Sequence, residues 1–164
     1  MAPIRMGFIG CGGNARGHIG RVLEMGECEV VSLCDSSEGS LQAACEHYGE
    51  DVKHLPRFVD YKEMLDSVEM DAVQISTPHT LHFEQIMASL DKGLHVLSEK
   101  PMVCTVDHAH QVIAKAEESG KVLMVSYQRH LGAQYRYVRN QIMAGEIGEI
   151  QFISALQDQA WYRG

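Results

Sequence analysis

The chain has 164 residues, of which 45% are hydrophobic and 22% are charged, and its formal net charge is −8. This length fits one domain of common size, and the composition is that of a globular protein rather than a disordered or fibrous one. The negative charge opposes binding to phosphate backbones and anionic lipid surfaces, and the sequence has no basic cluster to offset it. We therefore expect neither a nucleic-acid partner nor a membrane partner.

The cysteines and histidines give no sign of a disulfide framework or a metal site. The five cysteines are odd in number and form no C-x-x-C pair, which favours free thiols in a reducing compartment. The histidines lack thiolates or carboxylates at structural-zinc spacing. No apolar run has the length of a signal peptide or a transmembrane helix. These features predict a cytoplasmic protein without a metal.

Short apolar runs alternate with longer segments of helical period, an order typical of a mostly parallel sheet. Strands are predicted at Ile4–Ile9, Glu29–Cys34, Arg57–Val59, Asp71–Ser76, Leu94–Ser98 and Val122–Val125. Helices are predicted at Asn14–Met25, Ser36–His47, Tyr61–Leu65, Thr80–Lys92 and Thr105–Ser119. The simplest assembly of these elements is an α/β fold with a single doubly wound sheet over residues 1–126.

The pattern changes in the last part of the chain. Gln134–Met143 has helical period, Gly145 and Gly148 predict a turn, and Glu149–Gln157 alternates like a strand. Such a strand needs a partner sheet, and too few residues follow it to supply one. We therefore interpret residues 127–164 as a linker helix and the first strand of a truncated second α+β domain, or as an edge that an oligomer completes.

A glycine-rich segment follows the first predicted strand and opens the first predicted helix. Its residues Gly10, Gly12, Gly13, Asn14 and Ala15 fit the G-x-G-x-x-G/A pattern in the structural context that dinucleotide-binding turns require. Gly10 permits a tight turn, Gly12 has no side chain to block a pyrophosphate, and Ala15 lets helix and strand pack closely. Backbone N–H groups at the helix N-terminus would face the phosphates. The motif alone leaves open a turn without a ligand, or an S-adenosylmethionine site.

Asp35 ends the second predicted strand 20 residues after Ala15, where a carboxylate can hydrogen-bond the adenosine ribose hydroxyls. A 2′-phosphate would meet like charge there, with no arginine to receive it, so we expect NAD as the cofactor and NADP as the less favoured one. The alternative role for Asp35 is an N-cap of the next helix. With the glycine turn, Asp35 predicts the Rossmann dinucleotide-binding fold.

Two further polar segments follow the fourth and fifth predicted strands. They contain Thr77, Pro78 and His82 after one strand, and Glu99, Lys100 and Pro101 after the next. The carboxyl ends of parallel strands meet at one sheet edge, so both segments should open where ligands bind in such sheets. The alternative for Thr77 and Pro78 is a simple helix start, and for Lys100 a solvated lysine in a turn.

These segments together resemble the glucose-fructose oxidoreductase/inositol dehydrogenase/MocA (Gfo/Idh/MocA) family over about residues 4–157. The resemblance includes Tyr127-Gln128-Arg129 and Gly145–Ile150, which is similar to the family's entry into its C-terminal sheet domain. It implies an NAD(P)-dependent oxidoreductase that moves a hydride between nicotinamide and a sugar, polyol or related hydroxyl substrate. It also implies a homo-oligomer formed through the C-terminal domain.

The resemblance assigns roles to individual residues. The residues it places at the cofactor are Thr77, Pro78, His82, Glu99, Lys100 and Arg129. Lys100 is the catalytic candidate, because its ammonium would touch the substrate hydroxyl and stabilise oxygen charge or join a proton relay. Family members also use an aspartate and a histidine four residues apart in the C-terminal domain, and this chain ends before that segment. We therefore expect the chain alone to bind cofactor with little or no turnover.

Two other hypotheses remain from the sequence. A non-catalytic dinucleotide sensor would use the same glycine turn without needing Lys100, so the Glu99-Lys100-Pro101 segment counts against it. An S-adenosylmethionine methyltransferase shares the first strands and helix but does not explain the later motifs.

Overall fold

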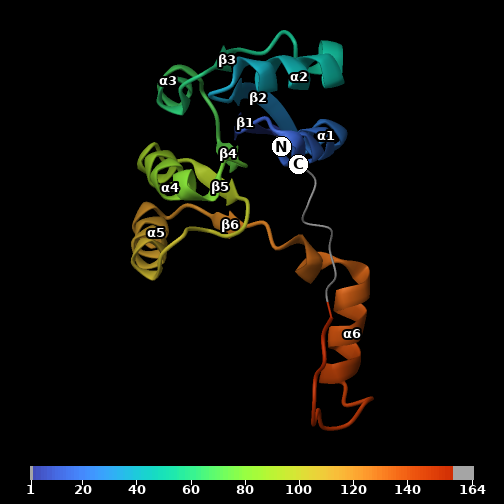
Figure 1. Cartoon of the computed structure of the whole chain (residues 1–164). Helices are drawn as coiled ribbons and strands as arrows, with labels where there is room; N and C mark the ends of the chain where they lie inside the picture. The colour runs from blue at the N-terminus through green and yellow to red at the C-terminus, as the bar shows by residue number, and fades with distance from the viewer. Residues whose placement is uncertain (1, 157–164) are drawn as a thin grey trace. The chain divides into compact units, whose positions relative to one another are not determined.

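The computed structural model describes residues 2–156 of the chain. It divides into two compact units, Met1–Ser126 and Tyr127–Gly164, each of which is treated by itself (Figure 1). No helix within the described residues is long and apolar enough to cross a membrane.

The first unit is built on one six-stranded, fully parallel sheet with the order β3-β2-β1-β4-β5-β6. The strands are β1 (Ile4–Ile9), β2 (Cys28–Cys34), β3 (Arg57–Phe58), β4 (Ala72–Ile75), β5 (His95–Ser98) and β6 (Leu123–Val125). The chain runs outward from β1 to β3 and then returns to β4 on the other side of β1. The direction of winding therefore reverses between β1 and β4, which is where such sheets bind ligands. The predicted doubly wound α/β fold is confirmed.

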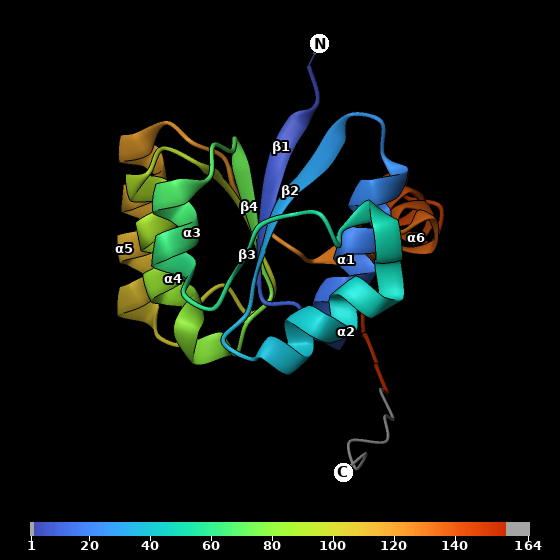
Figure 2. The same cartoon turned by 90° about the horizontal axis from the view of Figure 1, so that it is seen from above.

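Helices cover the sheet on both faces, as Figure 2 shows. On one face lie α1 (Gly13–Glu24) and α2 (Glu38–Tyr48), and on the other lie α3 (Tyr61–Ser67), α4 (His82–Asp91) and α5 (Val106–Ser119). Two 3-10 turns, η1 (Gly49–Asp51) and η2 (His79–Leu81), follow α2 and precede α4. This division follows from the right-handed crossover rule, because connections made in opposite directions along the sheet lie on opposite faces.

Two hydrophobic clusters hold these layers together. Neighbouring residues of β1 point to opposite faces, so Phe8 packs toward α1 and α2 with Ile19 and Leu33, whereas Ile9 joins the cluster under α3, α4 and α5. The central strand β4 is buried along its whole length, as expected for a strand covered on both faces. The site at the strand ends therefore rests on a buried, packed sheet.

Two helices differ from the sequence expectations. The predicted helix from Thr80 begins as η2, and α4 proper starts at His82. Along α5 the apolar spacing predicts that Val106, Val112 and Ile113 face inward, but only Val112 is fully buried, whereas Val106 is 72% exposed and Ile113 is 47% exposed. This helix covers the edge of the sheet beside β6, and so it buries a narrower stripe than a helix over central strands.

The second unit contains η3 (Gln128–Leu131) and α6 (Ala133–Met143), followed by a turn in which Gly145 and Gly148 have φ angles of +77° and +70°. The strand predicted at Glu149–Gln157 is wrong for residues 149–156, which form no regular element, and Gln157 lies outside the described residues. A strand is stable only when its N–H and C=O groups pair with a neighbour, and the described part of this unit offers no such edge.

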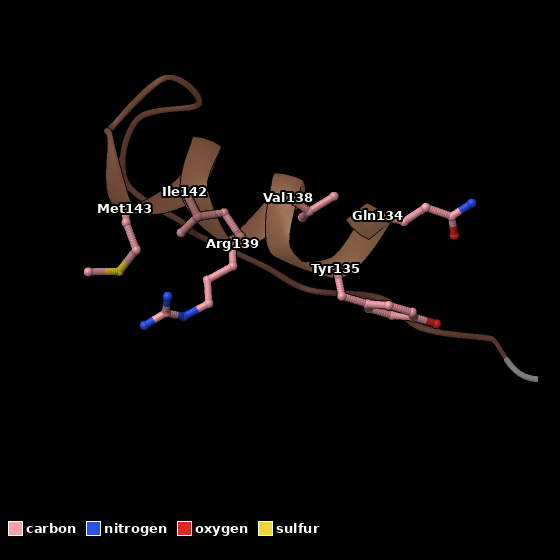
Figure 3. A pocket seen from close by; sticks show the side chains of 6 residues that line it. All are labelled: Gln134, Tyr135, Val138, Arg139, Ile142 and Met143. Atoms are coloured by element: carbon pink, nitrogen blue, oxygen red, sulfur yellow. The ribbon is translucent and has the colours of Figure 1, made fainter. Parts of the chain in front are cut away.

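One face of α6 carries a row of side chains at helical spacing. They are Gln134, Tyr135, Val138, Arg139, Ile142 and Met143, and they outline a shallow hollow of about 510 Å³ (Figure 3). Positions three and four apart share a helix face, which explains the row. The hollow contains none of the predicted site residues.

Candidate functional site

The glycine turn after β1 is shaped by two glycines with different roles. Gly10 has a φ of +94°, and a Cβ placed on it would lie 2.7 Å from the backbone carbonyl of Ser76. Only glycine fits there, because the turn crosses the chain leaving β4 at backbone contact. Gly12 has an ordinary φ of −66°, and a Cβ placed on it would meet nothing within 4 Å. The space over Gly12 is therefore open to a ligand.

The first turn of α1 faces this open space without a side-chain cap. Gly12 is the N-cap residue, and its carbonyl accepts a hydrogen bond from the N–H of Arg16 at 3.0 Å. Glycine has no side chain with which to cap the N–H groups of Gly13 and Asn14, whereas α2, α3 and α5 are all capped by a serine, aspartate or threonine. Ala15 is fully buried, so α1 packs directly on the sheet. Uncapped N–H groups at a helix N-terminus form an anion site.

Asp35 turns back onto the glycine turn. One of its carboxylate oxygens accepts the N–H of Cys11 at 2.8 Å, and the other accepts the N–H of Ser37 at 2.9 Å. The N-cap of α2 is Ser37, whose hydroxyl accepts the N–H of Ser40, so Asp35 is not the helix cap. A carboxylate has about four lone-pair positions, and two remain for further donors.

A cavity of about 310 Å³ lies against these residues, between the ends of β1, β2 and β4. Gly10, Gly12, Asp35, Thr77 and Pro78 all line it, so the structure brings five of the predicted site residues together.

The rest of the cavity wall was missed by the sequence analysis. Val59, Tyr61 and Leu81 form an apolar rim, in which Val59 is 53% exposed and Leu81 is 43% exposed. Burial raises the pKa of the Tyr61 hydroxyl, with nearby Glu84 and Asp60 acting in the same direction. The signal for these residues was weak, because β3 is only two residues long and its loop has no motif.

The turn after β4 is held by two buried side chains of α4. The hydroxyl of Thr77 donates to the amide oxygen of Gln85 at 2.5 Å. His82 is fully buried, and its ring nitrogens lie 3.0 Å from the carbonyl oxygen of Thr77 and 2.8 Å from that of Pro101. His82 therefore joins the two turns that follow β4 and β5, and it has no exposed surface to offer a ligand.

The turn after β5 contains Glu99, Lys100 and Pro101. Glu99 is buried to 4% exposure, and one of its oxygens lies 2.8 Å from Nε2 of His18 in α1. Lys100 is exposed, and its ammonium forms no ion pair within the part of the chain that the structure describes. His18 has no place in the glycine pattern and was missed. Arg129 belongs to η3 in the second unit and stays a prediction.

Fold and site together define a dinucleotide-binding α/β domain, with a glycine turn, a carboxylate after β2 and a lysine after β5. The family model described as "Oxidoreductase family, NAD-binding Rossmann fold" matches residues 4–127, and the chain belongs to this Gfo/Idh/MocA family. The predicted family is confirmed.

Several known proteins are similar to this chain. D-glucoside 3-dehydrogenase of Escherichia coli K12 is 30% identical over 94% of this chain and 43% of its own length. Alpha-N-acetylgalactosaminidase of Shewanella oneidensis is 28% identical over 92% of this chain and 34% of its own length. The WlbA dehydrogenase of Bordetella pertussis, solved with NADH and UDP-GlcNAcA, superposes with a TM-score of 0.81 at 31% identity, covering 89% of this chain and 43% of that one. The chain thus spans less than half the length of these relatives.

Proposed function

We propose that this chain is the nucleotide-binding part of an NAD-dependent oxidoreductase acting on a sugar, polyol or related hydroxyl compound. The observation that carries the proposal is the convergence of the glycine turn, the Asp35 carboxylate and the Glu99–Lys100 turn at the carboxyl edge of one parallel sheet. Each group comes from a different strand end, and the three match the chemically distinct parts of a dinucleotide and its substrate.

The described residues suit the adenosine and pyrophosphate parts of the dinucleotide. The apolar rim of Val59 and Leu81 suits an adenine ring, which would cover carbon surface that is now exposed. Asp35 has free lone pairs for ribose hydroxyls, and the open space over Gly12 suits a pyrophosphate on the uncapped end of α1. Asp35 lines the adenosine end, so a 2′-phosphate would meet a carboxylate, and NAD should be preferred to NADP.

Lys100 is the proposed catalytic residue. Bound NAD supplies a hydride acceptor for the carbon that carries the substrate hydroxyl. Before the carbon can give up a hydride, the hydroxyl must release its proton to solvent, and the negative charge that develops on the oxygen is relieved as the carbonyl forms. An ammonium held against that oxygen stabilises the charge and can pass a proton on. Lys100 is exposed beside the buried Glu99, so its amine is free to meet a substrate while its backbone is fixed.

Isothermal titration of the 164-residue chain with NADH and with NADPH tests the cofactor. We expect binding of NADH and at least tenfold weaker binding of NADPH, because one desolvated like-charge contact is worth several kcal/mol. If neither nucleotide binds, the proposal fails. If NADPH binds more tightly, the assignment of Asp35 fails.

The chemistry is tested separately from binding. The assay follows the absorbance of NADH as it forms from NAD⁺ in the presence of each member of a panel of sugars and polyols. It uses this chain and any longer protein encoded by the same reading frame. This chain alone should show little or no turnover, so Lys100→Ala is compared in the longer protein, where we expect it to abolish turnover while NADH still binds. A longer protein that binds NADH but oxidises no member of the panel would favour a sensor.

Glycoside cleavage is a second candidate, because one relative is named an alpha-N-acetylgalactosaminidase. Some glycosidases depend on NAD, so the same cofactor site serves both reactions. Chromogenic glycosides added with NAD⁺ distinguish them: release of the chromophore supports a hydrolase, and net formation of NADH supports a dehydrogenase.

We also propose a cytoplasmic location and partners limited to small molecules and further copies of the protein. The odd number of cysteines, all five of them unpaired, suits a reducing compartment. The net charge of −8 opposes nucleic acid. Oligomer formation through a C-terminal domain follows from the family resemblance alone.

A further inference from the structure

A buried ionisable pair lies between the cofactor helix and the turn that carries Lys100. His18 and Glu99 are 81 residues apart in the sequence, and their side chains meet at 2.8 Å between Nε2 and Oε1. Both are nearly removed from solvent, with side-chain exposures of 10% and 6%. Burying a carboxylate without a partner costs much free energy, because the group loses its hydration. The contact with His18 offsets that cost, so breaking it would be strongly unfavourable.

Glu99 is a carboxylate in this environment. Burial pushes its pKa upward, but hydrogen bonds from His18, Asn14 and the backbone N–H of Lys100 outweigh burial, and the net pKa lies below the ordinary value. An ionised carboxylate only accepts hydrogen bonds, so Nε2 of His18 carries the proton in this contact. One carboxylate thus ties together the first turn of α1, its second turn and the backbone of Lys100.

The turn after β5 is also held by a second histidine, which comes from a helix on the other face of the sheet. The carbonyl of Pro101 lies 2.8 Å from Nδ1 of His82, which comes from α4. Two buried histidines from helices on opposite faces of the sheet therefore hold the residues on either side of Lys100. Of the two, only His18 belongs to the helix whose N-terminus faces the proposed pyrophosphate.

We infer that the His18–Glu99 pair is a positioning device that couples dinucleotide binding at α1 to the placement of Lys100. The inference rests on the proposed function. A pyrophosphate bound at the first turn of α1 holds the helix, and Glu99 passes this constraint to the lysine backbone through the hydrogen bonds of Asn14 and His18. His18 touches neither cofactor nor substrate. It acts through Glu99.

The test compares His18→Leu with His18→Gln in the 164-residue chain. Leucine fills similar space without a donor, whereas the terminal amide of glutamine can donate from near the position of Nε2. We expect His18→Leu to weaken NADH binding about tenfold, within the range found for mutations that couple two sites, and His18→Gln to restore most of the affinity. His110→Leu, an exposed histidine on α5, is the matched control and should leave binding unchanged.

A second measurement reports on Lys100 itself. Acylation of Lys100 by an amine-reactive reagent is quantified by mass spectrometry relative to Lys121, which lies in the loop after α5. In the wild type, saturating NADH should lower the Lys100 to Lys121 ratio, and in His18→Leu it should lower it much less. General loosening of the fold would raise the labelling of both lysines and would leave the NADH effect on the ratio intact.

The outcomes separate the two proposals. Absence of NADH binding by the wild type overturns the proposed function. Wild-type binding with no change in Lys100 labelling, or His18→Leu with wild-type affinity and labelling, overturns the coupling while leaving cofactor binding in place. If His18→Leu does not fold, His18→Gln and Asn14→Ala decide. A loss of NADH affinity of about tenfold or more in His18→Gln contradicts the inference. Wild-type NADH affinity in Asn14→Ala contradicts it as well.

Discussion

Replacing each of the two glycines of the turn by alanine should have different effects: the change at Gly10 should lower stability, and the change at Gly12 should lower NADH affinity. At Gly10 the new Cβ would lie 2.7 Å from the carbonyl carbon and oxygen of Ser76 and 3.0 Å from the nitrogen of Thr77, all of them backbone atoms. The φ of +94° adds strain of its own, about 1–3 kcal/mol. Overpacking against a backbone that cannot yield adds about as much again. Gly10→Ala should therefore lose about 2–6 kcal/mol of unfolding free energy.

Gly12→Ala changes the same turn without this strain. Its φ of −66° suits alanine, and the new methyl group meets no atom within 4 Å. The loss of a glycine N-cap should amount to less than about 1 kcal/mol. The methyl group would stand in the space assigned to the pyrophosphate, so NADH affinity should fall by about a hundredfold or more, equivalent to about 3 kcal/mol of overpacking.

Thermal unfolding and NADH titration measured on both variants check this contrast. The unfolding midpoint should fall by about 2–4 °C for each kcal/mol lost in a domain of this size, so Gly10→Ala should stand well below the wild type and Gly12→Ala close to it. A Gly12→Ala variant that binds NADH normally would show that no phosphate approaches this residue. A Gly10→Ala variant with an unchanged midpoint would refute the packing argument.

Three further predictions concern single side chains. Asp35→Asn should weaken NADH binding about tenfold while weakening NADPH binding less, because a charge-assisted hydrogen bond is lost but a repulsion is removed, and titration with both nucleotides measures the ratio. Hydrogen bonds and charge from Arg5 lower the pKa of Asp71 to about 2, so the stability contributed by this pair is complete above about pH 4 and is lost as the pH falls toward 2. Asp71→Asn should flatten that part of the pH dependence in urea unfolding, and an unchanged slope would contradict the assignment. Burial raises the pKa of Cys11 and of Cys34 to about 12, so both stay protonated at pH 8, and exposed Cys104 should be alkylated first in a time course followed by mass spectrometry.

The sequence was sufficient for the sheet because its strands are short, apolar and separated by strong punctuation. Gly93 and Gly120 end α4 and α5 with φ angles of +71° and +64°, and Ser37 and Thr105 cap α2 and α5, so local chemistry sets these boundaries. The prediction of a strand after residue 148 was wrong for the opposite reason. Its alternating pattern indicates only that one face could be buried, and no neighbouring strand is present among the described residues.

The site was predictable where residue type alone determines the role. Gly10 and Asp35 follow from steric room and charge at fixed spacing along the chain. The role of His18 could not be predicted in this way, because it depends on a contact with Glu99, which lies 81 residues away in the sequence. A histidine inside an amphipathic helix looks the same in sequence whether it faces a carboxylate or only fills space. The apolar rim at Val59 and Leu81 likewise arises from two segments, one after β3 and one after β4, that meet in space.

Asp35 is already rigid before any nucleotide arrives, because two backbone N–H groups fix its carboxylate. Ordering a free side chain on binding costs about 0.5–1.5 kcal/mol, and this residue avoids that loss. The same two bonds make Asp35 part of the turn that it serves, since one of them holds the N–H of Cys11. Redesign toward NADP by replacing this aspartate with a cation would therefore remove a support of the glycine turn, and a second substitution would be needed to accept the abandoned N–H. In this fold, cofactor preference and the shape of the phosphate-binding turn depend on the same carboxylate, so one cannot be changed without the other.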